Sequence, residues 1–319
     1  MNQQLDFTDA QVALGFVMPA FYNVERTVYQ TKYQAFDYAS LIPVVTEGNE
    51  WARGVTFRSS DIAGKAEFLS GKGFDMPYAD VSQTQHMKGF ELAGIGYEWT
   101  LEEIQVAAME GRQLSSEKAE AARKVAERML WGIALSGTAE KNWKGLLNDA
   151  NVAAADVAAN GTGSTTWWAN KTPDQILADI NGGLTGIFTD TKGAEFGDTV
   201  LLPASLWDHL ASTPRTNTSD TTILNYLLQN NAYTARTRRP LTVQGLFELN
   251  TADPGGDGRA VIYARNPDVV RMHLPMPHKF LPPFQKSSMT FEVAGIMRTG
   301  GVEIRLPKAV RYLDGIVDS

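Results

Sequence analysis

The stretch of residues 50–82 limits the fold more than any other part of the chain, because it has an extended pattern and too few apolar residues to form a core of its own. Alternation over residues 51–57 is typical of a strand with one apolar face, Ser-Ser-Asp at residues 59–61 favours a turn, and residues 65–69 favour an antiparallel return. An isolated hairpin is only marginally stable in water. We therefore expect this hairpin to pack against a neighbouring surface.

The preceding residues, 1–45, are rich in aromatic side chains but show no clean helical or strand periodicity. Large apolar rings without a regular element of their own favour docking on another surface. The alternative is that these residues pack on their own domain.

Two helices are expected after the hairpin. Thr100 with Glu103 three residues later predicts a capping box for a short helix over residues 101–110. A longer helix is predicted from about residue 115 to residue 136. Small and apolar residues recur on one face of it at helical spacing, which favours close packing against a sheet: Ala119, Ala122, Ala126, Met129, Ile133 and Gly137.

A second lobe is expected after a stretch of Ala, Gly, Thr and Ser at residues 149–170, which has the composition of a linker. Thr172 and Gln175 flank a Pro-Asp pair and predict a helix start. Strand and helix patterns alternate from there to about residue 264. Near the end, two runs of alternating residues flank Gly300-Gly301, which predicts a hairpin turn. The chain as a whole is expected to be α+β.

Composition excludes several kinds of site. The 319 residues include no Cys, so disulfides, thiolate metal sites and a cysteine nucleophile are absent. The four His are scattered, and no phosphate-binding loop, dinucleotide fingerprint or nucleophile-elbow motif is present. No run of residues is long and apolar enough to span a membrane, and no basic residue precedes Arg26 as a secretory signal would require. The sequence thus predicts no enzyme, no cofactor or metal and no membrane partner.

The net charge of -7 lies wholly in the first third of the chain. Residues 1–114 hold 8 Lys and Arg against 15 Asp and Glu, and the remaining residues hold 21 of each. A protein that grips nucleic acid through its phosphates needs a basic stripe. The largest basic group is Arg236, Arg238 and Arg239, which is more simply an exposed loop or a salt-bridge donor between subunits.

The order of these parts resembles that of the major capsid proteins of tailed double-stranded DNA phages, which have the HK97-like fold. The sequences LSGTAEKNWKGLLN, IYARNPDVVRMHLPMPHKFLPPFQ and RTGGVEIRLPKAVRYLDGI carry the resemblance. Its most telling pieces are residues 145–148, which follow the long helix, and residues 298–307 near the end.

The resemblance implies a division of the chain into the parts of that fold. Residues 1–45 would be the N-arm and residues 46–90 the E-loop, an extended hairpin that reaches over a neighbouring subunit. Residues 91–170 would form the peripheral domain, with its spine helix at about 115–137. Residues 171–272 would form the axial domain, and residues 273–319 would return to the peripheral domain.

The resemblance also implies a function and a set of partners. The chain would assemble with itself into pentamers and hexamers of an icosahedral head that encloses double-stranded DNA without sequence-specific contacts. Portal, scaffolding and decoration proteins would be partners, and the protein would be assembled in the host cytoplasm and end in the virion. Candidate residues for contacts between subunits are Phe16, Phe21, Tyr22, Trp51, Phe57, Asp61, Lys65, Glu67, Phe68, Arg236, Arg238 and Arg239.

Two alternatives stay open from the sequence. An encapsulin-type nanocompartment would use the same fold to enclose a protein cargo, and an oligomeric α+β enzyme would belong to another class altogether. Covalent cross-linking, which occurs in some capsid proteins, would place Lys65 or Lys72 in the right region, but no motif carries that chemistry over to this chain.

Overall fold

The structure is a computed structural model that describes residues 36–46, 48–63, 79–110, 114–216, 218 and 220–318. The chain divides into two units, Met1–Ala35 and Phe36–Ser319, and every described residue belongs to the second. None of the described helices is long and apolar enough to cross a membrane.

An antiparallel hairpin is formed by β2 (Gly54–Ala63) and β3 (Asp80–Gly89), which pair from Gly54↔Gly89 to Ala63↔Asp80. The predicted turn at residues 59–61 is wrong, because β2 continues through Asp61 and pairs with residues 80–89. The predicted return at residues 65–69 lies outside the described residues. Ladder hydrogen bonds use main-chain groups, which every residue type here supplies, so ten-residue pairing outweighs the turn preference of three polar side chains.

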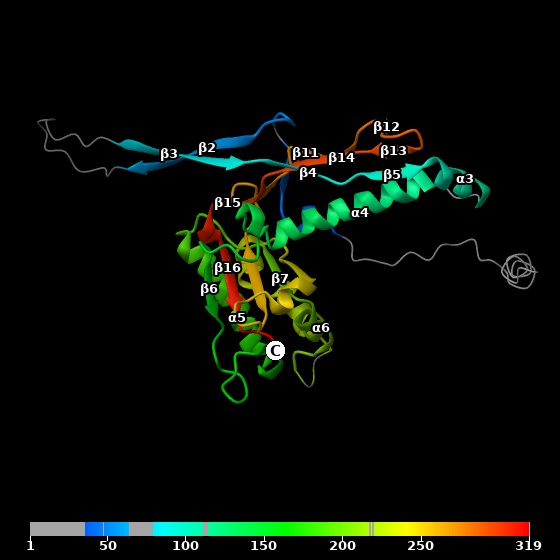
Figure 1. The fold of residues 1–319 in the computed structure, drawn as a ribbon. Helices are drawn as coiled ribbons and strands as arrows, with labels where there is room; N and C mark the ends of the chain where they lie inside the picture. Colours follow the sequence, from blue (N-terminus) through cyan, green and yellow to red (C-terminus); the bar gives the residue numbers. More distant parts are fainter. Residues whose placement is uncertain are drawn as a thin grey trace, which may run out of the picture. The chain divides into compact units, whose positions relative to one another are not determined.

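Two short sheets continue the chain beyond the hairpin, and each has three strands. The first has the order β11-β14-β4 and the second the order β12-β13-β5. The chain passes between the two sheets three times, from β4 to β5, from β11 to β12 and from β13 to β14, so the two sheets are successive parts of one ribbon (Figure 1). The strands are β4 (Glu91–Gly94), β5 (Tyr97–Thr100), β11 (Met276–Phe280), β12 (Phe284–Gln285), β13 (Thr290–Val293) and β14 (Gly295–Thr299).

Two helices follow β5, as predicted. In α3 (Leu101–Glu110) the capping box is present, since the amide of Glu103 donates to Thr100 Oγ1 and the amide of Thr100 donates to Glu103 Oε2. The longer α4 (Leu114–Leu135) packs against β5 and buries Ala122, Ala126, Leu130 and Ile133. Met129, predicted on this buried face, is 46% exposed, because it lies toward the edge of the buried stripe.

The segment that follows α4 closes its C-terminal end. Leu146 and Leu147 are buried, and their amides donate to the carbonyls of Ala134 and Leu135. The side-chain amide of Asn148 donates to the carbonyl of Ser136. Residues 145–148, which carry part of the resemblance, therefore satisfy main-chain carbonyls that a helix end leaves without partners.

A five-stranded sheet with the order β6-β16-β9-β7-β8 forms the core of an α/β lobe. The central strand β9 and its neighbour β7 are fully buried, and β9 runs antiparallel to both β16 and β7. The first helix of the lobe, α5, begins at the predicted Thr172 and Gln175 capping box. The strands are β6 (Ala153–Asp156), β7 (Thr199–Pro203), β8 (Thr242–Leu246), β9 (Arg259–Tyr263) and β16 (Val310–Asp314), and the helices are α5 (Pro173–Asp190), α6 (Ala204–Ser212), α7 (Ile223–Gln229) and α8 (Ala232–Thr237).

The predicted boundaries of this lobe differ from the observed pairing. Residues 149–170, expected as a linker, contain β6 and the fully buried Trp168. Residues 310–314, expected in the peripheral domain, form β16 between β6 and β9. The small residues of β6 can still form a strand, because its pairing in parallel with β16 uses main-chain groups. The lobe thus extends beyond residues 171–272 at both ends.

A third small sheet joins three distant segments, with β10 (Val270–His273) between β1 (Val44–Val45) and β15 (Gly301–Ile304). Leu41 and Ile42, at the end of α2 (Tyr38–Leu41) and just before β1, are buried, so the predicted arm of residues 1–45 includes residues that belong to the core. Four short 3₁₀ helices complete the described elements: η1 (Ala139–Lys141), η2 (Trp168–Asn170), η3 (Phe247–Thr251) and η4 (Pro307–Ala309).

Gly300-Gly301 is not the hairpin turn that the sequence predicts. The strand before it, β14, pairs with β11 and β4, whereas β15 pairs with β10, so the chain leaves one sheet and enters another. Gly301 has φ of +69°, and a Cβ there would lie 3.0 Å from the Trp143 ring. Only glycine fits both the left-handed backbone and this close approach.

Candidate assembly surfaces

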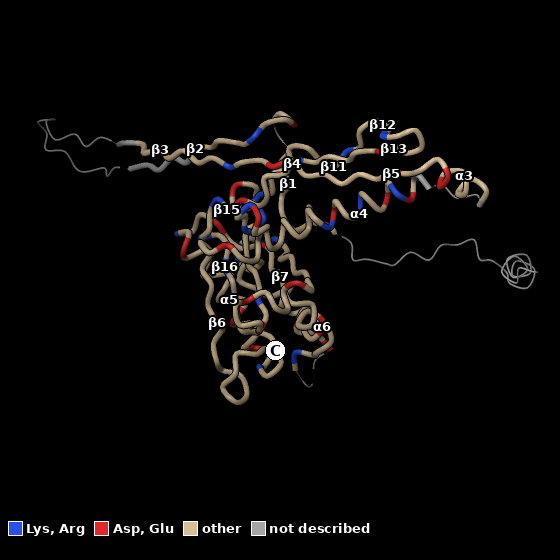
Figure 2. The backbone as a smooth tube through the Cα atoms, in the orientation of Figure 1, with Lys and Arg blue, Asp and Glu red and all other residues tan. Residues whose placement is uncertain are grey.

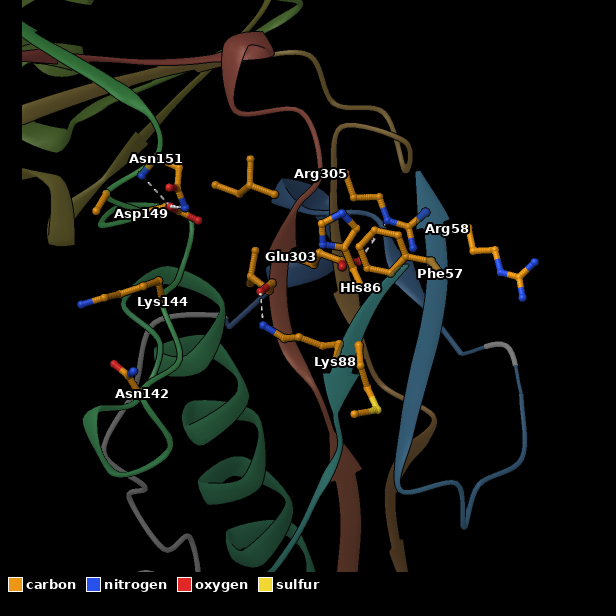
Figure 3. A pocket seen from close by; sticks show the side chains of 14 residues that line it. Phe57, Arg58, His86, Lys88, Asn142, Lys144, Asp149, Asn151, Glu303 and Arg305 are labelled. Atoms are coloured by element: carbon orange, nitrogen blue, oxygen red, sulfur yellow. Dashed lines mark hydrogen bonds and ion pairs between the residues drawn. The ribbon is translucent and has the colours of Figure 1, made fainter. Parts of the chain in front are cut away.

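A cavity of about 840 Å³ lies where the hairpin joins the rest of the unit (Figure 3). Phe57 and Arg58 on β2 and His86 and Lys88 on β3 line one side. The other side is formed by β15 and the residue that follows it, Arg305, together with residues after α4. The described residues contain no group of three His, Asp or Glu side chains that could hold a metal ion.

Phe57 is held by two side chains of its own subunit. Its ring stacks on that of His86, with 5.1 Å between centroids and 22° between planes. The guanidinium of Arg305 lies 4.2 Å from the ring centroid, which is within the range of a cation–π contact. Phe57 was predicted to contact another subunit, and the structure places it against Arg305.

Arg305 is itself held by a partly buried carboxylate. Arg305 Nε donates to Glu303 Oε2 at 3.0 Å, and the same oxygen is 2.9 Å from His273 Nε2. Burial alone would raise the pKa of Glu303, but the hydrogen bonds from His273 and Arg305 hold that pKa below its usual value. His273 is 4% exposed and its ring lies beside that of Phe90, so it is a buried, hydrogen-bonded residue of the subunit.

Lys88 attaches the second strand of the hairpin. Its Nζ donates to the main-chain carbonyl of Val302 at 3.1 Å and lies 5.9 Å from the centroid of the Trp143 ring. Burial lowers the pKa of Lys88, and the carboxylates of Glu303 and Asp149 oppose that shift. The site therefore keeps an ammonium group half-buried beside two acidic side chains.

A second surface lies on α3 and on the β12–β13 hairpin, where large apolar side chains face solvent. The amide of Leu101 donates to the carbonyl of Met289, which joins these two elements. We call this surface the apolar tip, and its exposed residues are Leu101 (44%), Val106 (47%), Met109 (86%), Phe284 (69%) and Met289 (53%). Monomeric soluble proteins rarely leave large apolar side chains gathered in this way.

Charged groups border the apolar tip. Lys286 lies between Glu98 and Glu292, 3.4 Å from a carboxylate oxygen of each. Glu98 and Glu292 face each other across β5 and β13. Along α4 acidic and basic positions are interleaved (Figure 2). The apolar side chains of the tip thus have a polar rim, as the cores of protein interfaces do.

The other predicted contact residues are placed as follows. Trp51 is 58% exposed, and Arg298 donates to its carbonyl and to that of Ala52. Asp61 pairs with Ser82 in the hairpin. Six of the predicted residues lie outside the described residues: Phe16, Phe21, Tyr22, Lys65, Glu67 and Phe68.

The three arginines near the end of α8 are exposed. The guanidinium of Arg236 lies 3.7 Å from the centroid of the Phe188 ring, and Arg238 caps the helix with φ of +58°. Among the described residues, Arg236, Arg238 and Arg239 have no ion-pair partner. These cations are free to meet an acidic surface.

Sequence reasoning missed Lys88, Glu303 and Arg305 as well as the apolar tip. Lys88 and Val302 are 214 residues apart, so no local motif joins them. Phe284 and Met289 follow a stretch that contains four Pro between residues 274 and 283. Alternation of Phe291 and Val293 was the available signal for a sheet there, and a sheet with one open face leaves apolar side chains exposed.

Comparisons with known proteins agree with this geometry. A search of curated proteins found no match. The family model described as major capsid protein matches residues 64–316. Among solved structures, the capsid of Myoviridae phage XM1 aligns with a TM-score of 0.76 at 19% identity, covering 93% of this chain and 98% of that one.

Two further solved structures extend over nearly the whole chain. A chain of Microbacterium phage Oxtober96 aligns with a TM-score of 0.62 at 10% identity, and one of Mycobacterium phage Bobi with 0.59 at 13%. Each alignment covers 97% of this chain and 100% of the other. The fold is the HK97-like fold of phage capsid subunits, and the family match extends over most of the sequence, so the chain belongs to the major capsid protein family.

Proposed function

We propose that this chain is the shell-forming subunit of a tailed phage head, which assembles with itself into pentamers and hexamers of an icosahedral shell around double-stranded DNA. The apolar tip is the observation that carries the proposal. Its five large side chains are 44–86% exposed in the described part of the subunit, and burying them further would supply assembly free energy in proportion to the apolar area removed from water.

A second copy of this chain is the occupant that we assign to the apolar tip. A shell subunit meets its copies through heterologous contacts, in which one surface packs on a different surface of the next copy. Glu98, Glu292 and Lys286 form the polar rim of the tip. Such a rim suits a surface that faces water in the unassembled subunit and is covered by another copy after assembly. The exposed Arg236, Arg238 and Arg239 offer the opposite charge to the acidic first third of a neighbour.

The parts of the fold receive roles under this proposal. Residues 46–90, which contain the β2–β3 hairpin, serve as the E-loop and lie on a neighbouring subunit, and α4 serves as the spine helix of the peripheral domain. The axial domain comprises the α/β lobe, including β6 and β16, and it meets its copies around the fivefold and sixfold axes. Residues 1–35 serve as the N-arm.

The proposal extends to partners and place. Portal, scaffolding and decoration proteins are the expected partners, the DNA is enclosed without sequence-specific contacts, and the shell is assembled in the host cytoplasm before it becomes part of the virion. The match to the major capsid protein family favours this function over a nanocompartment or an enzyme. We assign no catalytic residue.

Electron microscopy and size-exclusion chromatography of the full chain, expressed alone and with its neighbouring genes, test this function. We expect capsomer rings or closed shells, with packaged DNA in the second case. Protein cargo in place of DNA would support the nanocompartment, and a discrete monomer or dimer under both conditions would overturn the proposal.

A charged substitution at the apolar tip tests the surface itself. Phe284→Glu is expected to prevent shell formation while the melting temperature of the subunit stays unchanged, because loss of a central aromatic contact typically weakens an interface by about 2 kcal/mol or more. Phe247→Glu is the matched control, since Phe247 lies on η3, away from the tip, and is 68% exposed compared with 69% for Phe284. Normal shells from Phe284→Glu would contradict the role of the tip.

A further inference from the structure

The two strands of the hairpin are attached to the same short segment, residues 302–305. Phe57 on β2 packs under the guanidinium of Arg305, and Lys88 on β3 donates to the carbonyl of Val302. Residues 302–304 lie in β15, which is itself fixed by pairing with β10 from Val270↔Ile304 to His273↔Gly301. The hairpin is thus held at two points by a strand that cannot easily move.

The side chain of Arg305, which forms the first of these two contacts, is itself fixed by neighbouring residues. Arg305 is oriented by Glu303, whose second partner is the buried His273, so the guanidinium has little freedom to leave the Phe57 ring. An arginine that is both stacked and hydrogen-bonded gives a directional contact that a flexible lysine would not give. In Figure 3 the Arg305 and Phe57 side chains face each other beside the His86 ring.

Lys88 adds a contact that burial alone does not explain. A half-buried ammonium is costly, and an apolar side chain would pack beside Trp143 without that cost. The lysine instead donates to one defined main-chain oxygen, in the field of Glu303 and Asp149. Polar groups retained at such a cost can select one arrangement over others.

We infer that Arg305 and Lys88 form a two-point clamp that fixes the direction in which the β2–β3 hairpin leaves the subunit. The main chain also holds the base of the hairpin, since the amide of Phe90 donates to the carbonyl of Arg53. The two side-chain attachments lie further along β2 and β3, so together they restrict rotation of the hairpin about that base. Arg305 and Lys88 are therefore positioning residues for the hairpin. The clamp follows from contacts within one subunit, and only its consequence for the shell rests on the proposed function.

The absence of cysteine makes a direct test possible, since two introduced cysteines are the only sites that take a spin label. Spin labels are attached at Gln85→Cys, on the exposed part of β3, and at Lys308→Cys, on η4. Double electron–electron resonance measures the distance between the two labels, which reports the position of the hairpin relative to the rest of the subunit. Labelled full-length chain is diluted with unlabelled chain, so that only distances within one subunit are measured. We expect a single narrow distance peak.

The clamp variants are expected to lose this narrow peak. Lys88→Met keeps the length of the side chain but removes the donor, and Phe57→Ala removes the stacking face while leaving Arg305, Glu303 and His273 in place. Both variants broaden the distribution, and combining them broadens it further. Phe57→Trp keeps an aromatic face and is expected to retain the narrow peak. Arg305→Lys keeps the charge but not the planar group and is expected to broaden the distribution.

Arg58→Ala is the matched control. Arg58 is an exposed arginine next to Phe57 on the same strand, and it has no hydrogen-bond or ion-pair partner among the described residues. Its removal is expected to leave the peak unchanged. A combined Phe57→Ala and Lys88→Met chain that is folded by circular dichroism and keeps the wild-type peak would overturn the clamp.

Particle images of the same variants then test the consequence for the shell. Wild-type chain is expected to give particles of one diameter, and the combined variant is expected to give mixed diameters and open shells. If the combined variant shows a broadened distance distribution but the wild-type chain forms no particles, the result would support the clamp and count against the proposed function. Uniform shells from a combined variant with broadened distances would overturn the link between the clamp and assembly.

Discussion

The hydroxyl of Tyr263 donates a hydrogen bond to the main-chain carbonyl of Leu41, with 2.7 Å between the two oxygens. Tyr263 lies in β9, in the centre of the five-stranded sheet, and Leu41 ends α2, at the start of the described chain. Both residues are buried. The bond therefore ties the first described helix to the core of the α/β lobe.

Tyr263→Phe is expected to lower the free energy of unfolding by about 1–2 kcal/mol, because it leaves the buried Leu41 carbonyl without its donor. Burial raises the pKa of Tyr263, so the hydroxyl stays protonated and the loss is the same at pH 6 and pH 8. Urea unfolding of the unassembled chain measures it. Tyr226→Phe is the control, since the Tyr226 hydroxyl has no hydrogen-bond partner in the described residues. Equal losses from both variants would contradict the assignment.

Removal of one partner from the buried pair of Arg259 and Asp314 is expected to cost far more. The guanidinium donates to both carboxylate oxygens, at 2.6 and 2.7 Å, and also to the carbonyl of Leu147. Asp314→Asn leaves a buried cation without its counter-charge, which typically costs about 3–5 kcal/mol. Thermal unfolding measures the loss.

Glu120→Gln provides the comparison on the surface. Glu120 forms an exposed pair with Lys124 one helical turn away, and exposed pairs of this kind contribute little. We expect its melting temperature to match that of the wild type. A change as large as that of Asp314→Asn would show that burial is not what makes the Arg259 pair important.

The Glu303 carboxylate predicts a dependence of stability on pH. Its pKa in the folded chain is below that of the unfolded chain, about 4.3 for an ordinary Glu, so its stabilising contribution is complete above that value and is lost as the pH falls further. The difference in unfolding free energy between wild type and Glu303→Gln should be constant above about pH 5 and should shrink below about pH 4.3.

Glu195 gives the opposite sign and serves as the control. Burial, with the nearby Asp198 and Asp268, raises its pKa, so folding is disfavoured once the group ionises. Glu195→Gln is expected to stabilise the chain at neutral pH and to have no effect well below pH 4. A Glu303→Gln difference that does not change between pH 7 and pH 3 would contradict the role given to His273 and Arg305.

Two glycines should respond to alanine in opposite ways. Gly301→Ala places a methyl group 3.0 Å from the Trp143 ring on a left-handed backbone, and we expect a loss of about 1–2 kcal/mol. Gly132 lies inside α4 with no atom within 4 Å of an added Cβ, so Gly132→Ala should raise stability by about 1 kcal/mol. Urea midpoints measure both, and a stabilising Gly301→Ala would show that the corner does not need glycine.

Local motifs could be predicted from the sequence because their partners are close along the chain. The capping boxes of α3 and α5 each join residues three positions apart, and both are present. The long helix α4 follows from repeated small residues on one face. These features depend on interactions within about one helical turn.

Distant pairings could not be predicted in this way. The parallel pairing of β6 with β16 joins segments whose composition indicates a loop and a different domain. The hairpin register depends on residues 80–89, whereas turn-forming side chains at residues 59–61 suggested an earlier reversal. Of the candidate site, the aromatic Phe57 was recognised from its strand pattern, but its partner Arg305 was not, because nothing local distinguishes that arginine.

Gly300 is the single residue between β14 and β15, and it is fixed on both sides. Its amide and the Thr299 hydroxyl both donate to the carbonyl of His273, and the amide of Gly301 donates to Thr299 Oγ1. A single hydrogen-bonded residue therefore joins the ribbon that ends in the apolar tip to β15, the strand that holds the hairpin, so the two cannot move independently at this point. A tilt applied to one would act as torque on the other, so strain at one contact of a subunit would be carried mechanically to the next.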